Sequence, residues 1–245
     1  MNLFPKAITW RKTILLYRFL RYRKGFGVHS PFAFSFITKV IDERCEYYAY
    51  RDIELIRRQL MHARCAELKS DIKESHGQLL FRIVNYFKPR KLVQVGASAG
   101  IGTLYMTACS SRMDYMVLGK SQESIDQTAW SLKKMYPAGS RGTLMAGDYK
   151  QHLAKALEQM GTIDLLFLDA PEEKENNRIY INEAMQHIHS DTIFFIEGIR
   201  ANKEMRLLWE ELCSQEKVAV TFDLYSVGIV FFNKRLYKQN YVVFF

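Results

Sequence analysis

Glycines recur in residues 96–103, which read GASAGIGT and directly follow a short apolar run over residues 92–95. Gly96, Gly100 and Gly102 carry no Cβ, so the backbone can turn tightly there and lie close to a ligand. Thr103 has a side chain suited to an N-cap, and we expect it to cap the helix that follows. The same sequence could also form a tight turn that binds no ligand. The position of the turn directly after the first predicted strand favours a binding site.

Polar residues also follow the other apolar runs that we predict to be parallel strands. These residues are Gly119 and Lys120, Gly147 and Asp148, Asp169, and Glu197 with Arg200. Ligands of an open parallel sheet bind beyond the carboxyl ends of its strands. We therefore expect these residues and the glycine turn to surround one crevice, in which Asp169 and Glu197 are the candidate proton acceptors.

Helical spacing dominates the first third of the chain. The sequence predicts helices over residues 31–43, from residue 52 and over residues 77–87, with Ser30 as the first N-cap and Pro31 at the first helical position. We therefore interpret residues 1–88 as a helical N-terminal extension.

From residue 91 onward, short apolar runs alternate with helical patterns. The predicted strands are residues 92–95, 115–118, 143–146, 163–168 and 192–196, and then residues 218–224, 228–232 and 241–245. Strands that alternate with helices pair in parallel, whereas strands joined by turns add antiparallel pairs at a sheet edge. Residues 89–245 are therefore predicted to form a Rossmann-like three-layer α/β sandwich with antiparallel C-terminal strands.

The N-terminal arm, residues 1–24, holds seven basic residues and no acidic one, whereas the remaining chain has 28 basic and 26 acidic residues. Its apolar residues cover the whole circumference of a helix, unlike the single apolar face of a membrane-surface helix. The favoured interpretation is packing against the protein body or a second subunit in a homodimer. Contact with nucleic-acid phosphate is the less favoured alternative.

Composition excludes several classes of protein. With 245 residues, of which 48% are hydrophobic, the chain is too apolar for a disordered one and suits one α/β domain with an extension. No apolar run reaches the ~18 residues needed to span a bilayer. The four cysteines form no CxxC pair, which argues against a zinc or redox site and favours a cytoplasmic location.

Residues 92–103 resemble motif I of the class I S-adenosylmethionine-dependent methyltransferases. Gly147 with Asp148, and residues 167–170, resemble later motifs of the small-molecule O-methyltransferases in that superfamily. Residues 25–32 look like the N-terminal segment of a poorly characterised bacterial branch. The resemblance covers nearly the whole chain, most clearly from about residue 77, and implies S-adenosylmethionine as cofactor and a small-molecule methyl acceptor.

The resemblance also implies roles for individual residues. Gly96, Ala97, Ser98 and Gly100 would lie beneath the methionine and ribose of the cofactor. Asp148 would lie near the adenine. Gln94 and Gly119 would complete the cofactor site. Asp169 would face the methionine end or the acceptor, and with Glu197 it is a candidate catalytic residue.

Three positions depart from the family pattern. Gln94 stands where an acidic residue is frequent, and Gly119 stands where an acid accepts both ribose hydroxyls. Losing one charge-assisted hydrogen bond costs about 1.5–3 kcal/mol, which is roughly ten- to hundred-fold in affinity. We therefore expect Gly119→Glu to tighten cofactor binding. Gly198 replaces a ligand of the cation-dependent members, so no metal is expected.

These departures leave two alternatives to a small-molecule methyltransferase. One is a catalytically impaired, methyltransferase-like binding or scaffold protein. The other is an RNA-directed methyltransferase that uses the basic arm. A dehydrogenase is disfavoured, because its dinucleotide turn also needs an acid after the second strand.

Overall fold

The computed structural model describes residues 13–14, 17–19, 27–110, 112–170 and 176–245. Most of the N-terminal arm and the segment 171–175 lie outside these ranges, and so do the predictions made for them. No helix in the described ranges is both long and apolar enough to cross a membrane.

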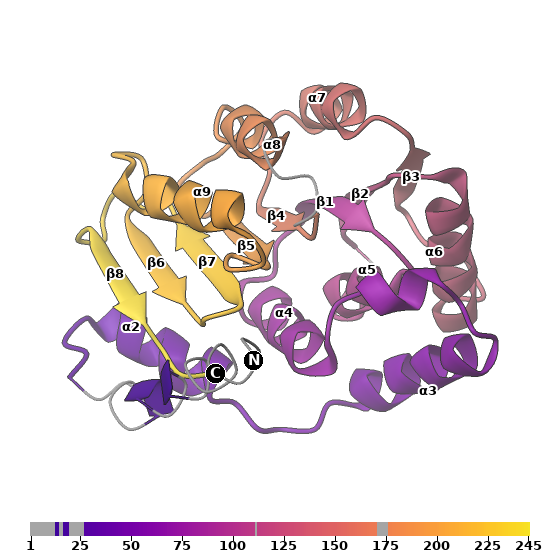
Figure 1. Ribbon diagram of the computed structural model, residues 1–245, viewed down its shortest axis with the longest axis horizontal. Coiled ribbons are helices and arrows are strands. Elements are labelled where there is room, and N and C mark those ends of the chain that lie inside the picture. The colour runs from indigo at the N-terminus through magenta and orange to yellow at the C-terminus, as the bar shows by residue number, and fades with distance from the viewer. Residues whose placement is uncertain (1–12, 15–16, 20–26, 111, 171–175) are drawn as a thin grey trace, which may run out of the picture.

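Helices dominate the region before the sheet, as the spacing predicted (Figure 1). They are α2 (Pro31–Phe36), the π-helical turn η1 (Ile37–Ile41), α3 (Tyr48–His62), the 3-10 turn η2 (Glu67–Ser70) and α4 (Glu74–Phe87). Ser30 Oγ accepts from the N–H of Ala33 at 3.3 Å and Pro31 opens α2, which confirms the predicted helix start. The helices α3 and α4 begin earlier than predicted, at Tyr48 and Glu74.

Within the described ranges, eight strands form one sheet in the order β3-β2-β1-β4-β5-β7-β6-β8. They are β1 (Lys91–Ala97), β2 (Asp114–Gly119), β3 (Thr143–Ala146), β4 (Leu165–Leu168), β5 (Ile193–Glu197), β6 (Val220–Asp223), β7 (Val227–Phe231) and β8 (Gln239–Val242). The first five strands pair in parallel, and β7 runs antiparallel to both β5 and β6. The predicted Rossmann-like sandwich is confirmed, and β7 is antiparallel as expected. The edge strand β8 differs from the prediction and pairs in parallel with β6, because the chain turns back after β7 and continues on the far side of β6.

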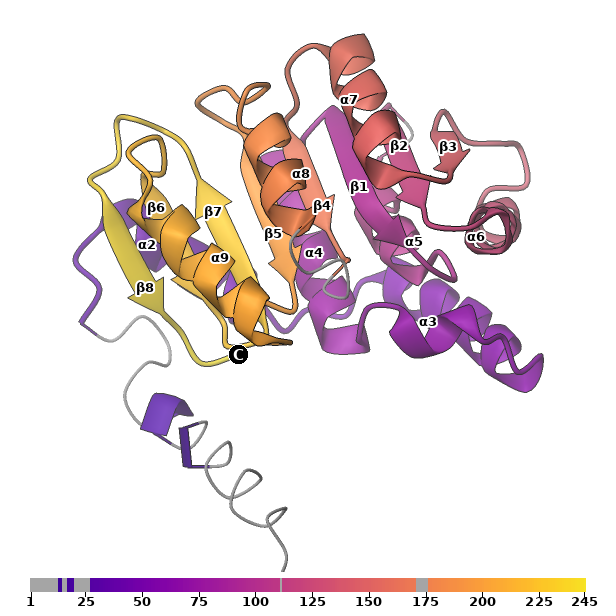
Figure 2. The same cartoon turned by 45° about the horizontal axis from the view of Figure 1, so that its top comes forward.

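Helices cover both faces of this sheet (Figure 2). The crossover helices are α5 (Ile101–Thr107), α6 (Gln122–Met135), α7 (Tyr149–Met160), α8 (Asn176–Ala184) and α9 (Lys203–Ser214). One hydrophobic core joins a sheet face to α2, α3, α4 and α5, and the other joins the opposite face to α7, α8 and α9. Because helices cover both faces of the parallel strands, the side chains on both faces are buried. This explains why the sequences of these strands are nearly continuous apolar runs.

The helical extension shares its core with the C-terminal strands. The ring of Phe36 in α2 lies 4.7 Å from that of Phe222 in β6 and 5.1 Å from that of Phe231 in β7. Because one core spans both regions, the division between residues 88 and 89 into two domains stays a prediction.

Candidate functional site

A cavity of about 410 Å³ lies at the carboxyl ends of β4 and β5. Asp169 directly follows β4, Glu197 ends β5, and both line the cavity. Its other walls come from residues 70–73, before α4, from Gly198, Arg200 and Ala201, after β5, and from residues 225–226, in the turn between β6 and β7. The structure thus brings the two candidate proton acceptors to one cavity, whereas Gly119 and Asp148 do not line it.

The glycines of the turn are required by the packing of the chain itself. Gly96 has φ +100°, and a Cβ there would stand 2.0 Å from the carbonyl oxygen of Asp169. A Cβ at Gly100, with φ +88°, would stand 2.8 Å from Cα of Thr128 in α6. These contacts correct the interpretation that the missing Cβ atoms leave room for a ligand. Ala97 is buried, and only Ser98 of the turn is partly exposed.

A carboxylate that the sequence analysis did not single out holds the turn. Asp71 Oδ2 accepts from the N–H groups of Ala99 at 2.9 Å and Ile101 at 3.1 Å. Its Oδ1 accepts from those of Gly102 at 3.0 Å and Ile72 at 2.8 Å. Asp71 therefore satisfies the free N–H groups at the start of α5, where a dinucleotide pyrophosphate would otherwise bind. This observation argues independently against a dehydrogenase.

Thr103 does not cap α5, which corrects our prediction. The residue is fully buried inside the helix, and its hydroxyl donates to Gln94 Oε1 at 2.7 Å. Gln94 is 2% exposed, so its side chain lies in the core beneath the turn. A neutral amide oxygen satisfies the hydroxyl there without burying a charge.

Gly119 ends β2, as predicted, but has no room for a side chain. A Cβ would stand 2.6 Å from Ser124 Oγ and 2.7 Å from Ile125 Cγ1, in the first turn of α6. The Ser121–Ser124 capping box fixes that turn in place. A side chain at position 119 would have to displace these two side chains, so we revise the expectation for Gly119→Glu: the substitution should destabilise the protein rather than restore a ribose contact.

Asp148 is exposed and acts as the N-cap of α7. Its Oδ1 accepts from the N–H of Lys150 at 3.1 Å, which stabilises the helix start. Helix capping and a contact with a ligand's adenine are compatible, because the second carboxylate oxygen remains available to a donor.

Glu197 is paired with a residue that the sequence analysis did not consider. Glu197 Oε1 lies 2.7 Å from His76 Nδ1 in the first part of α4. The other oxygen, Oε2, is buried and has no hydrogen-bond partner among the described residues.

Few side chains at the site could hold a divalent metal, and its absence stays an expectation. Gly198 supplies no side chain, and one oxygen of Glu197 is engaged with an imidazole. The described residues contain no group of three or more metal-binding side chains.

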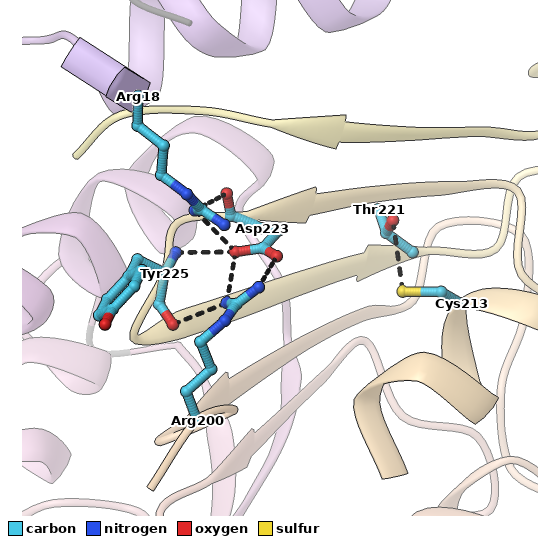
Figure 3. A network of polar contacts seen from close by, with 6 residues as sticks. All are labelled: Arg18, Arg200, Cys213, Thr221, Asp223 and Tyr225. Carbon is cyan, nitrogen blue, oxygen red and sulfur yellow. Dashed lines mark hydrogen bonds and ion pairs between the residues drawn. The ribbon is translucent and has the colours of Figure 1, made fainter. Parts of the chain in front are cut away.

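Two arginines converge on Asp223 beside the cavity (Figure 3). Arg200 donates to its Oδ1 at 2.7 Å and Oδ2 at 2.5 Å, and also to the carbonyl of Tyr225. Arg18 of the N-terminal arm donates to Oδ1 at 3.0 Å. Arg200 therefore holds the turn that lines the cavity, and Arg18 attaches this part of the arm to the same turn.

The arginines determine the ionisation of this carboxyl group. Burial on its own would raise the pKa of Asp223, but hydrogen bonds and charges from Arg200 and Arg18 outweigh burial and hold that pKa below its usual value. The carboxylate is therefore ionised throughout the neutral range.

No protein-family model and no curated protein matches the chain. Solved structures show its fold, which is that of O-methyltransferases. A Bacillus cereus O-methyltransferase in complex with S-adenosylhomocysteine has 16% identity and a TM-score of 0.61, with 80% of this chain and 94% of that one covered. An S-adenosylhomocysteine-bound methyltransferase from Podospora anserina has 15% identity and a TM-score of 0.62, with 80% and 92% covered.

A third structure has the same architecture. It is a Streptomyces achromogenes O-methyltransferase involved in tomaymycin synthesis, in complex with S-adenosylmethionine. It has 13% identity and a TM-score of 0.55, with 76% of this chain and 89% of that one covered. At these identities the comparisons show the arrangement of strands and helices, which agrees with the predicted fold.

Removing the Asp71 carboxylate should loosen the glycine turn. We expect Asp71→Ala to lower the free energy of unfolding by about 2–4 kcal/mol, because several buried N–H groups lose their acceptor. Asp71→Asn should have a smaller effect, since one oxygen remains. Denaturant unfolding measures both, with the exposed Asp52→Ala as control; equal stability of Asp71→Ala and the control would contradict this role.

Adding a side chain at Gly119 should destabilise the protein without improving cofactor binding. We expect Gly119→Ala to cost about 1–3 kcal/mol through overpacking against α6, and Gly119→Glu to cost more. Thermal unfolding and calorimetry with S-adenosylhomocysteine measure the two effects. Tighter binding by a stably folded Gly119→Glu would refute the packing argument.

The Asp223 ion pairs should make stability depend on pH at the acid end. A carboxyl whose pKa is lower in the folded state stabilises above its unfolded pKa, about 3.9, and loses that contribution as pH falls through the folded value. We expect Asp223→Asn to cost about 3 kcal/mol at pH 7 and progressively less below about pH 4. Denaturant unfolding from pH 7 to pH 3 gives this difference; a difference that stays constant with pH would contradict it.

Proposed function

We propose that the protein is an S-adenosylmethionine-dependent methyltransferase that acts on a small molecule, with O-methyl transfer as the form that the resemblance implies. The main supporting observation is the cavity at the carboxyl ends of β4 and β5, beside the glycine turn. Ligands of this fold bind at that edge of the sheet, and structures that share the fold contain S-adenosylmethionine or S-adenosylhomocysteine.

The cofactor would lie against the outer side of the turn, at Ser98, with Asp169 at its methionine end and Asp148 at its adenine. Gly96, Ala97 and Gly100 would shape the main chain beneath it. Gln94 would support the turn from the core. The space at Gly119 is filled by α6, so the ribose hydroxyls would bind without a carboxylate from that position.

The cofactor's sulfonium supplies a methyl group that is already activated for transfer. The chain then has to hold the acceptor atom in line with that methyl group and accept a proton. Asp169 and Glu197 are our candidates for this task, because both line the cavity.

A binding or scaffold protein without turnover is the second candidate. The observation that favours it is the filled position at Gly119, which removes the carboxylate that usually holds the ribose. A second subunit or a nucleic acid as partner of the N-terminal arm stays a prediction.

Calorimetry with S-adenosylmethionine and S-adenosylhomocysteine tests the proposal. We expect dissociation constants of about 10–100 µM. Asp148→Ser should weaken binding about ten-fold, or ~1.4 kcal/mol, while its hydroxyl still caps α7 and preserves stability. Asp52→Ser is the matched control on α3.

Absence of binding at about 1 mM ligand would exclude the methyltransferase and favour the scaffold protein. Unchanged affinity in Asp148→Ser would show that the adenine does not reach that residue.

A further inference from the structure

Another cavity, of about 580 Å³, lies at the edge of the sheet opposite the candidate functional site. Three connecting segments form it, and we call it the basic cavity. Its lining residues are Met185, Gln186 and residues 188–191, before β5, Lys217, before β6, and residues 232–235, after β7. Because β5 and β7 are antiparallel neighbours, the start of β5 and the end of β7 lie at the same edge (Figure 2). None of these residues lines the candidate functional site, so the two cavities are separate.

The inner wall of the basic cavity is apolar. Met185, Ile188 and Phe232 form it. The ring of Phe232 packs edge-to-face against that of Phe194 in β5, with 4.7 Å between the ring centroids. All four side chains belong to, or pack against, the core that joins the sheet to α7, α8 and α9. A close-packed core holds its side chains in place, so this wall is a fixed apolar surface.

Three cations surround that wall. Lys217, Lys234 and Arg235 line the basic cavity, and all three residues are exposed. None of their side chains forms a hydrogen bond or an ion pair with any other residue that the structure describes. The neighbouring Lys238 differs, because it donates to two carbonyl oxygens at the end of α9, at 2.8 and 2.6 Å. Asp191 is the one acidic side chain among the lining residues, so the cavity is positively charged.

Hydrogen-bonded turns fix the backbone that carries these cations. The turn over residues 233–236 is closed by a backbone hydrogen bond of 2.9 Å between its ends. Asn233 Oδ1 also accepts from the N–H of Arg235 at 3.0 Å, and Lys234 and Arg235 are the two central residues of this turn. Lys217 lies in a second turn, which a backbone hydrogen bond of 3.1 Å closes. A backbone that is ordered before a ligand arrives lowers the entropic cost of binding.

His189 lines the same cavity but adds no charge to it. The N–H of Asp191 donates to His189 Nδ1 at 3.1 Å, so the ring proton is on Nε2. That nitrogen donates to Asp164 Oδ1 at 2.7 Å. Both ring nitrogens are therefore engaged with the protein, and the charge that a ligand meets comes from the three cations and Asp191.

We propose that the basic cavity binds an organic anion, whose apolar part lies against the inner wall and whose acidic group lies among Lys217, Lys234 and Arg235. An apolar wall favours an apolar ligand, and a cleft lined mainly by one sign of charge attracts the opposite sign. A neutral apolar compound would leave the cations unpaired, whereas an inorganic anion would leave the wall in contact with water. This site goes beyond the proposed methyltransferase function and does not depend on it.

A small molecule suits this site better than a membrane surface. The volume of the cavity lies in the range of roughly 300–1,000 Å³ that is usual for small-molecule sites, which combine apolar walls with a few polar groups. A lipid bilayer would contact the exposed cations but would not reach the wall between them. The wall and the cations are satisfied together only by a ligand that enters the cavity.

Two dyes that differ only in one charged group test the proposal. The anion 8-anilinonaphthalene-1-sulfonate has an apolar body with one sulfonate, and N-phenyl-1-naphthylamine is the same molecule without the sulfonate. Fluorescence titration gives the affinity of the protein for each dye. We expect the anion to bind at least about ten-fold more tightly than the neutral dye. This preference should decrease as salt is added, because the cations are exposed.

Neutralising the cations locates the binding site. The triple variant Lys217→Gln, Lys234→Gln and Arg235→Gln should weaken binding of the anion about ten-fold. Its affinity for the neutral dye should stay unchanged, because the apolar wall is intact. The matched control removes the same charge at exposed helix positions that do not line the basic cavity, and consists of Lys133→Gln, Lys155→Gln and Arg206→Gln.

Equal affinities for the two dyes, or an equal loss in the triple variant and its control, would overturn the proposal. So would the absence of anion binding at about 100 µM dye, or displacement of the anion by S-adenosylhomocysteine, which would place the dye in the candidate functional site. Binding to phosphatidylglycerol vesicles that the triple variant loses, with equal affinities for the dyes, would assign the cations to a membrane surface instead. The dye comparison needs no cofactor, so it decides the question whether or not the proposed function holds.

Discussion

The hydrogen bonds from the glycine turn to Asp71 are the constraint on which the site depends. This one carboxylate accepts four backbone N–H groups and joins the segment before α4 to the start of α5. The same segment, residues 70–73, forms a wall of the cavity. The position of the turn and the shape of the cavity are therefore coupled through Asp71, and neither is set by the glycines alone.

Local patterns in the sequence were sufficient to predict the fold. Alternating apolar runs and helical spacing indicated the parallel sheet, and the rule for open sheets placed Asp169 and Glu197 together. The partners of these groups were not predictable in the same way. Asp71 contacts the turn across 28–31 positions and His76 contacts Glu197 across 121, and neither contact leaves a periodic signal.

The two glycine positions show where interpretation from family patterns fails. The absence of a side chain at Gly96 suggested space for a ligand, and at Gly119 it suggested a lost ligand contact. In the structure both positions are filled by other parts of the chain, the end of β4 and the first turn of α6. The sequence around each glycine is the same whether the space beside it holds a ligand or another part of the chain. Only the tertiary structure distinguishes the two interpretations.

The carboxylates around the cavity show how this chain differs from the pattern it resembles. Asp71 is committed to backbone N–H groups and Asp223 to Arg200 and Arg18. Glu197 is committed at one oxygen and unpartnered at the other within the described residues. Asp71 and Asp223 thus hold segments of the cavity wall in place. Ser70, Lys73 and Asp169 line the same cavity, so most of the polar atoms that face it come from side chains other than these two carboxylates.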